Sequence, residues 1–210
     1  MFQNIPTKVL TGEVRLSYVA LTAPRASVQG GEPKYSVTLL IPKEDTSTYQ
    51  NIMNSIEAAA QDAAGRIWNG VRPPVLPIPI HDGDGVKQSG TPYGAECKGH
   101  WVMTAGTLNK PEVMRRTELG LIALEPHEIY SGMYAMVTIN FFGYSNSGKK
   151  GVGCGLGNVL KTRDGDPLAG GASAEVDFAE VGYTAPPPAY APAPGSSAIN
   201  PLTGQPIITA

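Results

Sequence analysis

Aromatic and basic side chains gather between residues 129 and 168 of this 210-residue chain. Tyr134, Phe142 and Tyr144 share one phase of a period-two pattern, and four cations follow them closely: Lys149, Lys150, Lys161 and Arg163. Flat rings of this kind stack on nucleic-acid bases, while cations hold the phosphates between the bases. The combination predicts a surface that binds single-stranded nucleic acid.

The opposite phase of the same stretch is apolar and consists of Met133, Ala135, Val137, Ile139 and Phe141. This alternation predicts a β-strand with one face in a core and the aromatic residues on the other face. Two alternatives remain for the aromatic face: a sandwich strand buried on both sides, or a strand covered by a helix. Bases can stack on the rings only if neither alternative holds.

Glycine occupies every second position of the next strand-like stretch, at residues 151, 153, 155 and 157, with apolar residues between. Strand glycine is typical of a tight corner in a barrel, and it also lets a flat ring approach the backbone closely. The two interpretations are compatible. The glycine face is therefore expected to bend the strand, to receive a ring, or to do both.

Several motifs that suggest catalysis or metal binding fail on inspection. Residues 143–150, GYSNSGKK, approach the phosphate-binding pattern GxxxxGK[ST], but Lys150 replaces the magnesium-binding hydroxyl and glycines follow where a helix is required. Residues 81–85, HDGDG, begin like a calcium loop, but Tyr93 stands where the bidentate Glu belongs. No GxSxG or HExxH motif occurs. We therefore expect no enzyme activity, no cofactor and no metal.

Charge divides the chain into two parts. All 16 Lys and Arg lie at or before Arg163, accompanied by 13 acidic residues, which leaves that part with a formal charge of +3. The remainder has 5 acidic residues and no basic one. A mildly basic body suits phosphate binding. We expect its groove to be lined by some of nine cations: Arg15, Lys34, Lys98, Arg115, Arg116, Lys149, Lys150, Lys161 and Arg163.

The N-terminal half predicts two strands and one helix. Residues 9–21 are expected to form a strand with a bulge or bend at Gly12, and residues 22–33 a loop. Residues 34–41 predict a second strand that pairs with the first. A helix is predicted over about 46–68, because apolar residues recur at spacings of three and four after a cap at Asp45 or Thr46.

Further strands and a tail complete the predicted organisation. Prolines make residues 69–94 an extended loop. Strands follow at 97–107, about 112–116 and 152–162, with a hairpin turn at 146–148. Short strands with a single inserted helix favour a small closed barrel over a parallel α/β sheet. Residues 164–210 are rich in Gly and Pro and predict a flexible, disordered tail behind a domain of residues 1–163.

Cysteine usage and hydropathy bear on the cellular compartment. Cys97 and Cys154 lie at no disulfide-framework or zinc-ligand spacing. The first residues do not show the charged segment and apolar run that are typical of a signal peptide, and no stretch approaches the ~18 apolar residues of a membrane span. These features predict a soluble cytoplasmic protein with reduced thiols and no membrane partner.

The run PHEIYSGMYAMVTINFFGYSNSGKKGVGCGLGNVLKTRDGDPLAGG, with ASAEVDF after it, resembles the signature of a family of bacteriophage single-stranded-DNA-binding proteins. The segments SVTLLIPK and GHWVMTAGT are also similar to that family, so the resemblance covers about residues 10–178. It implies a mainly β protein akin to the T7-type phage binding protein: an OB-fold five-stranded barrel with one inserted helix. The implied function is sequence-independent binding of single-stranded DNA, which the protein coats and protects in the bacterial host cytoplasm during phage DNA replication and recombination.

The resemblance also bears on the tail. Binding proteins of this kind often end in an acidic tip that recruits replication partners, whereas here the acidic residues Glu175, Asp177 and Glu180 surround Phe178 and the last thirty residues are uncharged. We expect the tail to contact phage or host replication and recombination proteins, or to compete with DNA for the basic groove. The alternative function is that of a phage virion structural or assembly protein without preference for single strands.

Overall fold

Five strands close into a ring in the computed structural model, which describes residues 5–26, 31–87 and 89–168. β2 (Val14–Arg25) pairs with β3 (Lys34–Pro42), and β3 pairs with β5 (His100–Thr107). β5 lies parallel to β9 (Lys149–Arg163). β9 pairs with β8 (Tyr134–Asn146), and the start of β8 returns to β2. The ring therefore closes on itself as a barrel.

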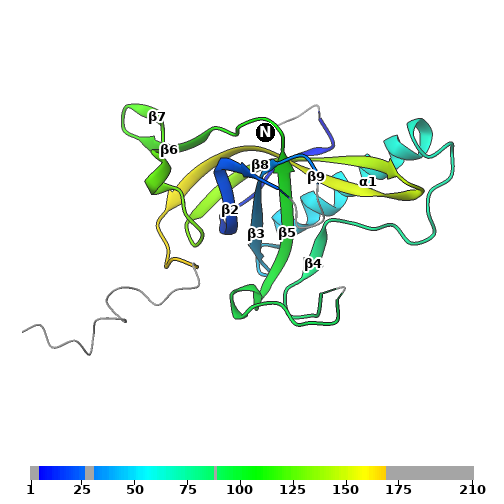
Figure 1. Ribbon diagram of the computed structural model, residues 1–210, viewed down its shortest axis with the longest axis horizontal. Helices are drawn as coiled ribbons and strands as arrows, with labels where there is room; N and C mark the ends of the chain where they lie inside the picture. The colour runs from blue at the N-terminus through cyan, green and yellow to red at the C-terminus, as the bar shows by residue number, and fades with distance from the viewer. Residues whose placement is uncertain (1–4, 27–30, 88, 169–210) are drawn as a thin grey trace, which may run out of the picture. The chain divides into compact units, whose positions relative to one another are not determined.

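Smaller elements are attached to this barrel. β1 (Lys8–Leu10) lies beside β8, and β4 (Ile80–Asp82) pairs with β5. β6 (Val113–Thr117) and β7 (Gly120–Ala123) form a hairpin whose first strand runs parallel to β9. The long β8–β9 pair crosses the molecule, with this hairpin toward one end and the helix toward the other (Figure 1). Two 3-10 turns complete the set: η1 (Ala95–Cys97) and η2 (Pro126–Glu128).

The helix α1 (Thr46–Arg66) begins at the predicted cap. The Asp45 carboxylate accepts a hydrogen bond from the Thr48 amide at 3.0 Å, and this bond satisfies one of the free amides of the first turn. The buried face of the helix consists of Thr48, Ile52, Ser55, Ile56, Ala59, Ala60 and Ala63. The small alanines allow the helix axis to lie close to the barrel.

The helix packs on the inner side of the far end of β8. A methyl group on Gly143 would overlap the Ala63 methyl, so glycine at this position permits the close contact. Trp68, fully buried just after the helix, donates from Nε1 to the Tyr144 carbonyl oxygen at 2.9 Å. The helix therefore closes one end of the core and leaves the outer face of β8 open.

The predicted alternation of β8 is confirmed. Its inward residues are almost completely buried, with Met133, Ala135 and Val137 at 0%, Ile139 at 1% and Phe141 at 2% exposure. The alternate residues are half-buried or exposed. The predicted hairpin turn is also correct: Ser147 and Gly148 form a two-residue loop with φ of +48° and +79°, as a type I′ turn requires.

Other boundaries differ from the sequence prediction. Gly12 separates β1 from β2 instead of bending one strand, because its N–H donates to the Thr48 hydroxyl at 2.8 Å and leaves the ladder. β2 also continues to Arg25, within the stretch predicted as loop. The irregularity of the first long strand lies at Tyr18 instead, where the register with β3 shifts.

The middle of the chain was also predicted incompletely. The loop predicted for residues 69–94 contains the short strand β4, and Cys97 belongs to η1 instead of to the strand that follows. The strand β7 was missed altogether. Its four residues are all exposed, so there was no alternation of buried and exposed positions to indicate a strand.

The closed five-stranded ring with one inserted helix is the OB-fold architecture that the sequence resemblance implies. In the part of the chain that the structure describes, no helix is long and apolar enough to cross a membrane.

Candidate nucleic-acid interface

Two aromatic rings lie flat on the glycine face of β9. Phe142 stands opposite Gly153 and Tyr144 opposite Gly151 in the β8–β9 register. A methyl group on Gly153 would lie 2.9 Å from Cζ of Phe142, and one on Gly151 would lie 2.6 Å from the Tyr144 hydroxyl oxygen. Only glycine leaves room for rings in this position. The close approach predicted for the glycine face therefore occurs, and the rings it receives are the protein's own.

We refer to Phe142, Tyr144, Gly151 and Gly153 as the aromatic platform. The Phe142 side chain is 47% exposed, and Tyr144 is half-buried. The helix packs against the opposite side of β8, at Gly143. Neither burial on both sides nor cover by the helix applies to Phe142, so a flat ligand can reach its outer face.

Polar groups continue the platform along the same face. Asn140 stands opposite Gly155, and Thr138 lies against Gly157. The Thr138 hydroxyl oxygen accepts a hydrogen bond from the Asn158 amide at 2.7 Å. The outer face of the hairpin is thus aromatic near its turn and polar toward its middle.

Tyr134 has a different environment from the other two predicted stacking residues. The guanidinium carbon of Arg163 lies 3.4 Å from the centre of its ring, and that of Arg15 lies 5.7 Å away. One face of the ring is therefore already stacked on a cation of the protein. Tyr134 also lies at the start of β8, whereas Phe142 and Tyr144 lie near its end.

Five of the nine predicted phosphate-binding cations already have partners within the protein. Arg15 donates to the Asp166 carbonyl oxygen at 2.7 Å, and Lys150 donates to that of Trp68 at 3.1 Å. The other three form ion pairs: Arg115 with Glu128 at 3.1 Å, Lys161 with Asp164 at 2.8 Å, and Arg163 with Glu13 at 2.9 Å. Their charges are partly neutralised before any ligand binds.

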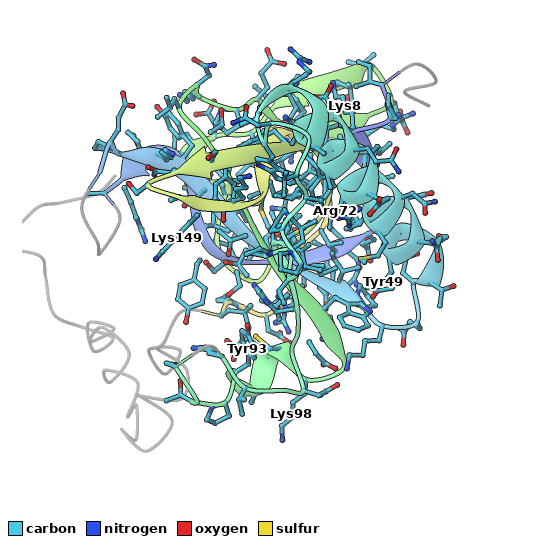
Figure 2. All side chains as sticks on the ribbon, turned by 90° about the vertical axis from the view of Figure 1, so that its right-hand side faces the viewer. Lys8, Tyr49, Arg72, Tyr93, Lys98 and Lys149 are labelled. Atoms are coloured by element: carbon cyan, nitrogen blue, oxygen red, sulfur yellow. The ribbon has the colours of Figure 1, made fainter. Side chains whose placement is uncertain are left out.

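The remaining four cations are exposed, and their side chains make no hydrogen bond or ion pair with other described residues: Lys34, Lys98, Arg116 and Lys149. Lys149 directly follows the turn of the β8–β9 hairpin and precedes Gly151 of the aromatic platform by two residues. In Figure 2 the labelled side chains of Lys98 and Lys149 extend away from the ribbon at different parts of the surface. Lys149 is thus the predicted cation best placed beside the exposed rings.

Two carboxylates keep the paired cations occupied at neutral pH. A hydrogen bond from Thr162 is the main cause that lowers the pKa of Glu13, and Arg163 lowers it further. The pKa of Asp164 is lowered chiefly by a hydrogen bond from Lys161 and then by one from Tyr130. Both groups therefore stay ionised near neutral pH and compete with phosphate for Lys161 and Arg163.

The chain beyond β9 remains bonded to the barrel as far as it is described. The Tyr130 hydroxyl donates to Asp164 at 2.8 Å, and the Leu168 amide donates to the Ser131 carbonyl oxygen at 2.8 Å. Leu168 packs beside the small cluster of Leu40, Cys97 and Val102. The predicted tail residues Glu175, Asp177, Phe178 and Glu180 lie outside the described residues.

The outer face of β3 and β5 is chemically unlike the aromatic platform. The hydroxyls of Thr38 and Thr104 lie 3.1 Å apart in a hydrogen bond across the two strands. Leu40 and Val102 continue this face as the small apolar cluster. These two strands occupy the places of the second and third strands of an OB barrel, whose face commonly binds oligonucleotides.

Sequence reasoning missed two features of the first strand pair. Tyr18 is 70% exposed with φ of +48°, and Arg25 pairs directly opposite Lys34. The bulge at Tyr18 does not change the hydrophobic pattern of the sequence. Pro24, directly before Arg25, favoured a loop around residues 24–25 instead of a strand. Among the described residues, no three His, Cys, Asp or Glu side chains could together hold a metal ion.

Comparison with known proteins identifies relatives with this architecture. Residues 7–185 match the family described as the single-stranded-DNA-binding protein of Enterobacter phage Enc34. The chain is 30% identical over 175 residues to protein p50 of Acyrthosiphon pisum secondary endosymbiont phage 1, an alignment that covers 81% of this chain and 91% of that protein.

Solved structures agree with this assignment. The bacteriophage Enc34 single-stranded DNA-binding protein in complex with ssDNA superposes with a TM-score of 0.65 at 30% identity, covering 77% of this chain and 89% of that one. The bacteriophage T7 single-stranded DNA-binding protein gp2.5 shares the fold, with a TM-score of 0.52 at 15% identity over 79% of this chain and 96% of that one. The chain therefore belongs to the family of the Enc34 phage single-stranded-DNA-binding protein.

Proposed function

We propose that this protein binds single-stranded DNA without sequence preference and coats it during phage DNA replication and recombination. The observation that carries the proposal is the exposed aromatic platform on β8–β9, in a chain whose relative has been solved in complex with ssDNA. The family consists of DNA-binding proteins, which agrees with the absence of an enzyme motif from the sequence.

Binding rests on stacking and on charge. Bases stack on Phe142 and Tyr144, and Lys149 beside the turn holds the backbone between them. Every base offers a flat π-face, so stacking tolerates all sequences and contributes about 1–3 kcal/mol per base. The cations that have no partner among the described residues supply most of the phosphate contacts, because breaking an existing ion pair offsets part of the gain. Tyr134 supports the cations around it more than it stacks on DNA.

The first test is the affinity of the full chain for a labelled oligomer of about 30 nucleotides, single-stranded and then duplex, at low and high salt. We expect tight binding to the single strand that weakens as salt rises, because each neutralised phosphate releases counterions. Equal affinity for the duplex would reduce the proposal to a general basic surface. Absence of binding would favour the virion structural or assembly protein.

The tail of residues 164–210 is a second part of the proposal. Its acidic cluster competes with DNA for the cations of the barrel, or it recruits phage or host replication proteins. Leu168 contacts the barrel, so a truncation after Leu168 leaves those contacts in place. Tighter DNA binding by this truncated protein is the expected result of competition. Unchanged or weaker binding would leave only the recruiting role.

A further inference from the structure

Tyr18 of β2 has a backbone conformation that its residue type disfavours. Its φ of +48° lies in the left-handed region, which a bulky side chain adopts only at a cost in free energy. The side chain is 70% exposed, so burial of the ring in the core does not offset that cost. Strain of this kind persists where the surrounding structure imposes it, and it is concentrated at functional sites.

A bulge in β2 imposes the conformation. Tyr18 and Val19 together stand opposite the single residue Val37, between two regular pairs, Ser17 with Thr38 and Ala20 with Ser36. Val19 packs against the core, and its amide donates to the Ser131 hydroxyl at 3.1 Å. The bulge is thus held from both sides, and the extra residue leaves the Tyr18 ring in solvent. Bulges re-aim side chains in this way next to binding sites.

Two cations lie further along the same strand pair. Arg25 pairs directly opposite Lys34, and both residues are exposed. Neither side chain makes a hydrogen bond or ion pair with another residue that the structure describes. Like charges directly opposite each other on a sheet repel, and a phosphate bound between them would remove that repulsion. The β2–β3 hairpin thus combines an exposed ring with two neighbouring exposed cations.

Building on the proposed function, we propose that Tyr18 stacks on a base of the bound single strand and that Arg25 and Lys34 hold a phosphate of the same strand. Tyr18 follows the part of β2 that pairs with the start of β8, whereas Phe142 lies near the end of β8. The single-stranded DNA is therefore held at two separated places on the barrel. The aromatic platform is one, and the β2–β3 hairpin is the other.

The test compares three substitutions of Tyr18 in the full chain. Tyr18→Phe keeps the ring, and its affinity for a 30-nucleotide single strand should stay within about twofold. Tyr18→Gly removes the ring and relieves the backbone strain, because glycine adopts positive φ at no steric cost. It should lower the affinity about 5- to 150-fold, the range for one stacked base, while raising the melting temperature. Tyr18→Ala should lower the affinity by a similar factor but change the melting temperature little, because alanine keeps the strained backbone conformation.

The opposite changes in affinity and melting temperature for Tyr18→Gly distinguish a binding residue from a structural one. Val75, 82% exposed in the loop after the helix, provides the matched control, and Val75→Ala should change neither quantity. Wild-type affinity of Tyr18→Gly for the single strand would overturn the inference and leave the proposed function intact. Failure of the wild-type chain to bind any single strand would instead overturn the proposed function.

Discussion

The aromatic platform and the Tyr18 bulge both expose a ring on the barrel, but they support it in opposite ways. Phe142 lies in a regular strand and rests on a neighbouring strand stripped of side chains at Gly153. Tyr18 lies in a β-bulge and is exposed by an extra residue at positive φ. The Phe142 ring is positioned by the space that Gly153 leaves beneath it, whereas the Tyr18 ring is positioned by the strained conformation of its own backbone.

The two arrangements differ in what they cost the folded protein. Glycine at alternate positions lowers strand propensity and packing, a loss spread over several residues of β9. The bulge concentrates about 1–3 kcal/mol of strain at one residue. Substitution of the exposed ring should therefore be nearly neutral for stability at the platform, whereas relief of the strain should be stabilising at the bulge.

The largest expected effect comes from removing both rings. If one DNA strand contacts both places, Tyr18→Ala combined with Phe142→Ala should lose the sum of the two single losses, about 2–6 kcal/mol of binding free energy. Titration of a fluorescent 30-nucleotide oligomer measures all three variants. Small losses in both single variants with a large loss in the double variant would mean two separate DNA sites.

Phe142→Ala alone should reduce the binding free energy by about 1–3 kcal/mol for all sequences alike. The ring is half exposed, so the melting temperature should change little. The matched control is the adjacent Phe141→Ala, which removes a ring that is 2% exposed and should cost about 3–5 kcal/mol of stability. If Phe142→Ala destabilises the fold as much as its neighbour, the ring belongs to the core.

Gly153→Ala tests the support beneath the platform. The added methyl would lie 2.9 Å from the Phe142 ring, so the ring must tilt away from β9. We expect a loss of about 1 kcal/mol of binding free energy, smaller than that from removing one stacked base. In the Phe142→Ala background the same methyl meets no ring and should leave affinity unchanged. A loss in that background would show that the methyl acts on the strand itself.

The smallest expected effect is on salt dependence. Lys149 forms no ion pair with another residue that the structure describes, so Lys149→Ala should flatten the slope of log affinity against log salt by about 0.7, the value for one phosphate of a single strand. Arg115→Ala removes a cation already paired with Glu128 and should flatten the slope less. Equal changes in slope for the two variants would mean that the ion pair opens when DNA binds.

Local sequence patterns predicted the elements of the aromatic platform because each of these elements depends on residues that are close together in the sequence. The period-two apolar face of β8, the two-residue turn and the alternating glycines are all set by neighbouring residues. The exposure of Phe142 follows from them. Tyr134 has the same phase as Phe142, yet Arg163 covers it, because a partner that is distant in the sequence cannot be inferred from phase.

The Tyr18 bulge could not be predicted for a related reason. A bulge is defined by the count of residues on two paired strands, and the sequence of one strand does not contain that count. The same limit applies to the cations. Whether Arg163 is available depends on Glu13, 150 residues earlier in the chain. The sequence therefore offers candidate DNA-binding residues, whereas the fold determines which of these candidates already have a partner within the protein.

The closed ring also has a consequence for how the protein folds. The β8–β9 hairpin forms from adjacent residues and can assemble quickly once it has been synthesised, since β-hairpins form in about 1–10 μs. Val14 finds its partner only at Ala135, and Gly106 finds its partner at Gly155. During synthesis the outer edges of β2 and β5 must therefore remain unpaired until β8 and β9 emerge, whereas β3 already has partners on both sides. We therefore expect barrel closure to be the slow step of folding, with the nascent chain most prone to aggregation just before it.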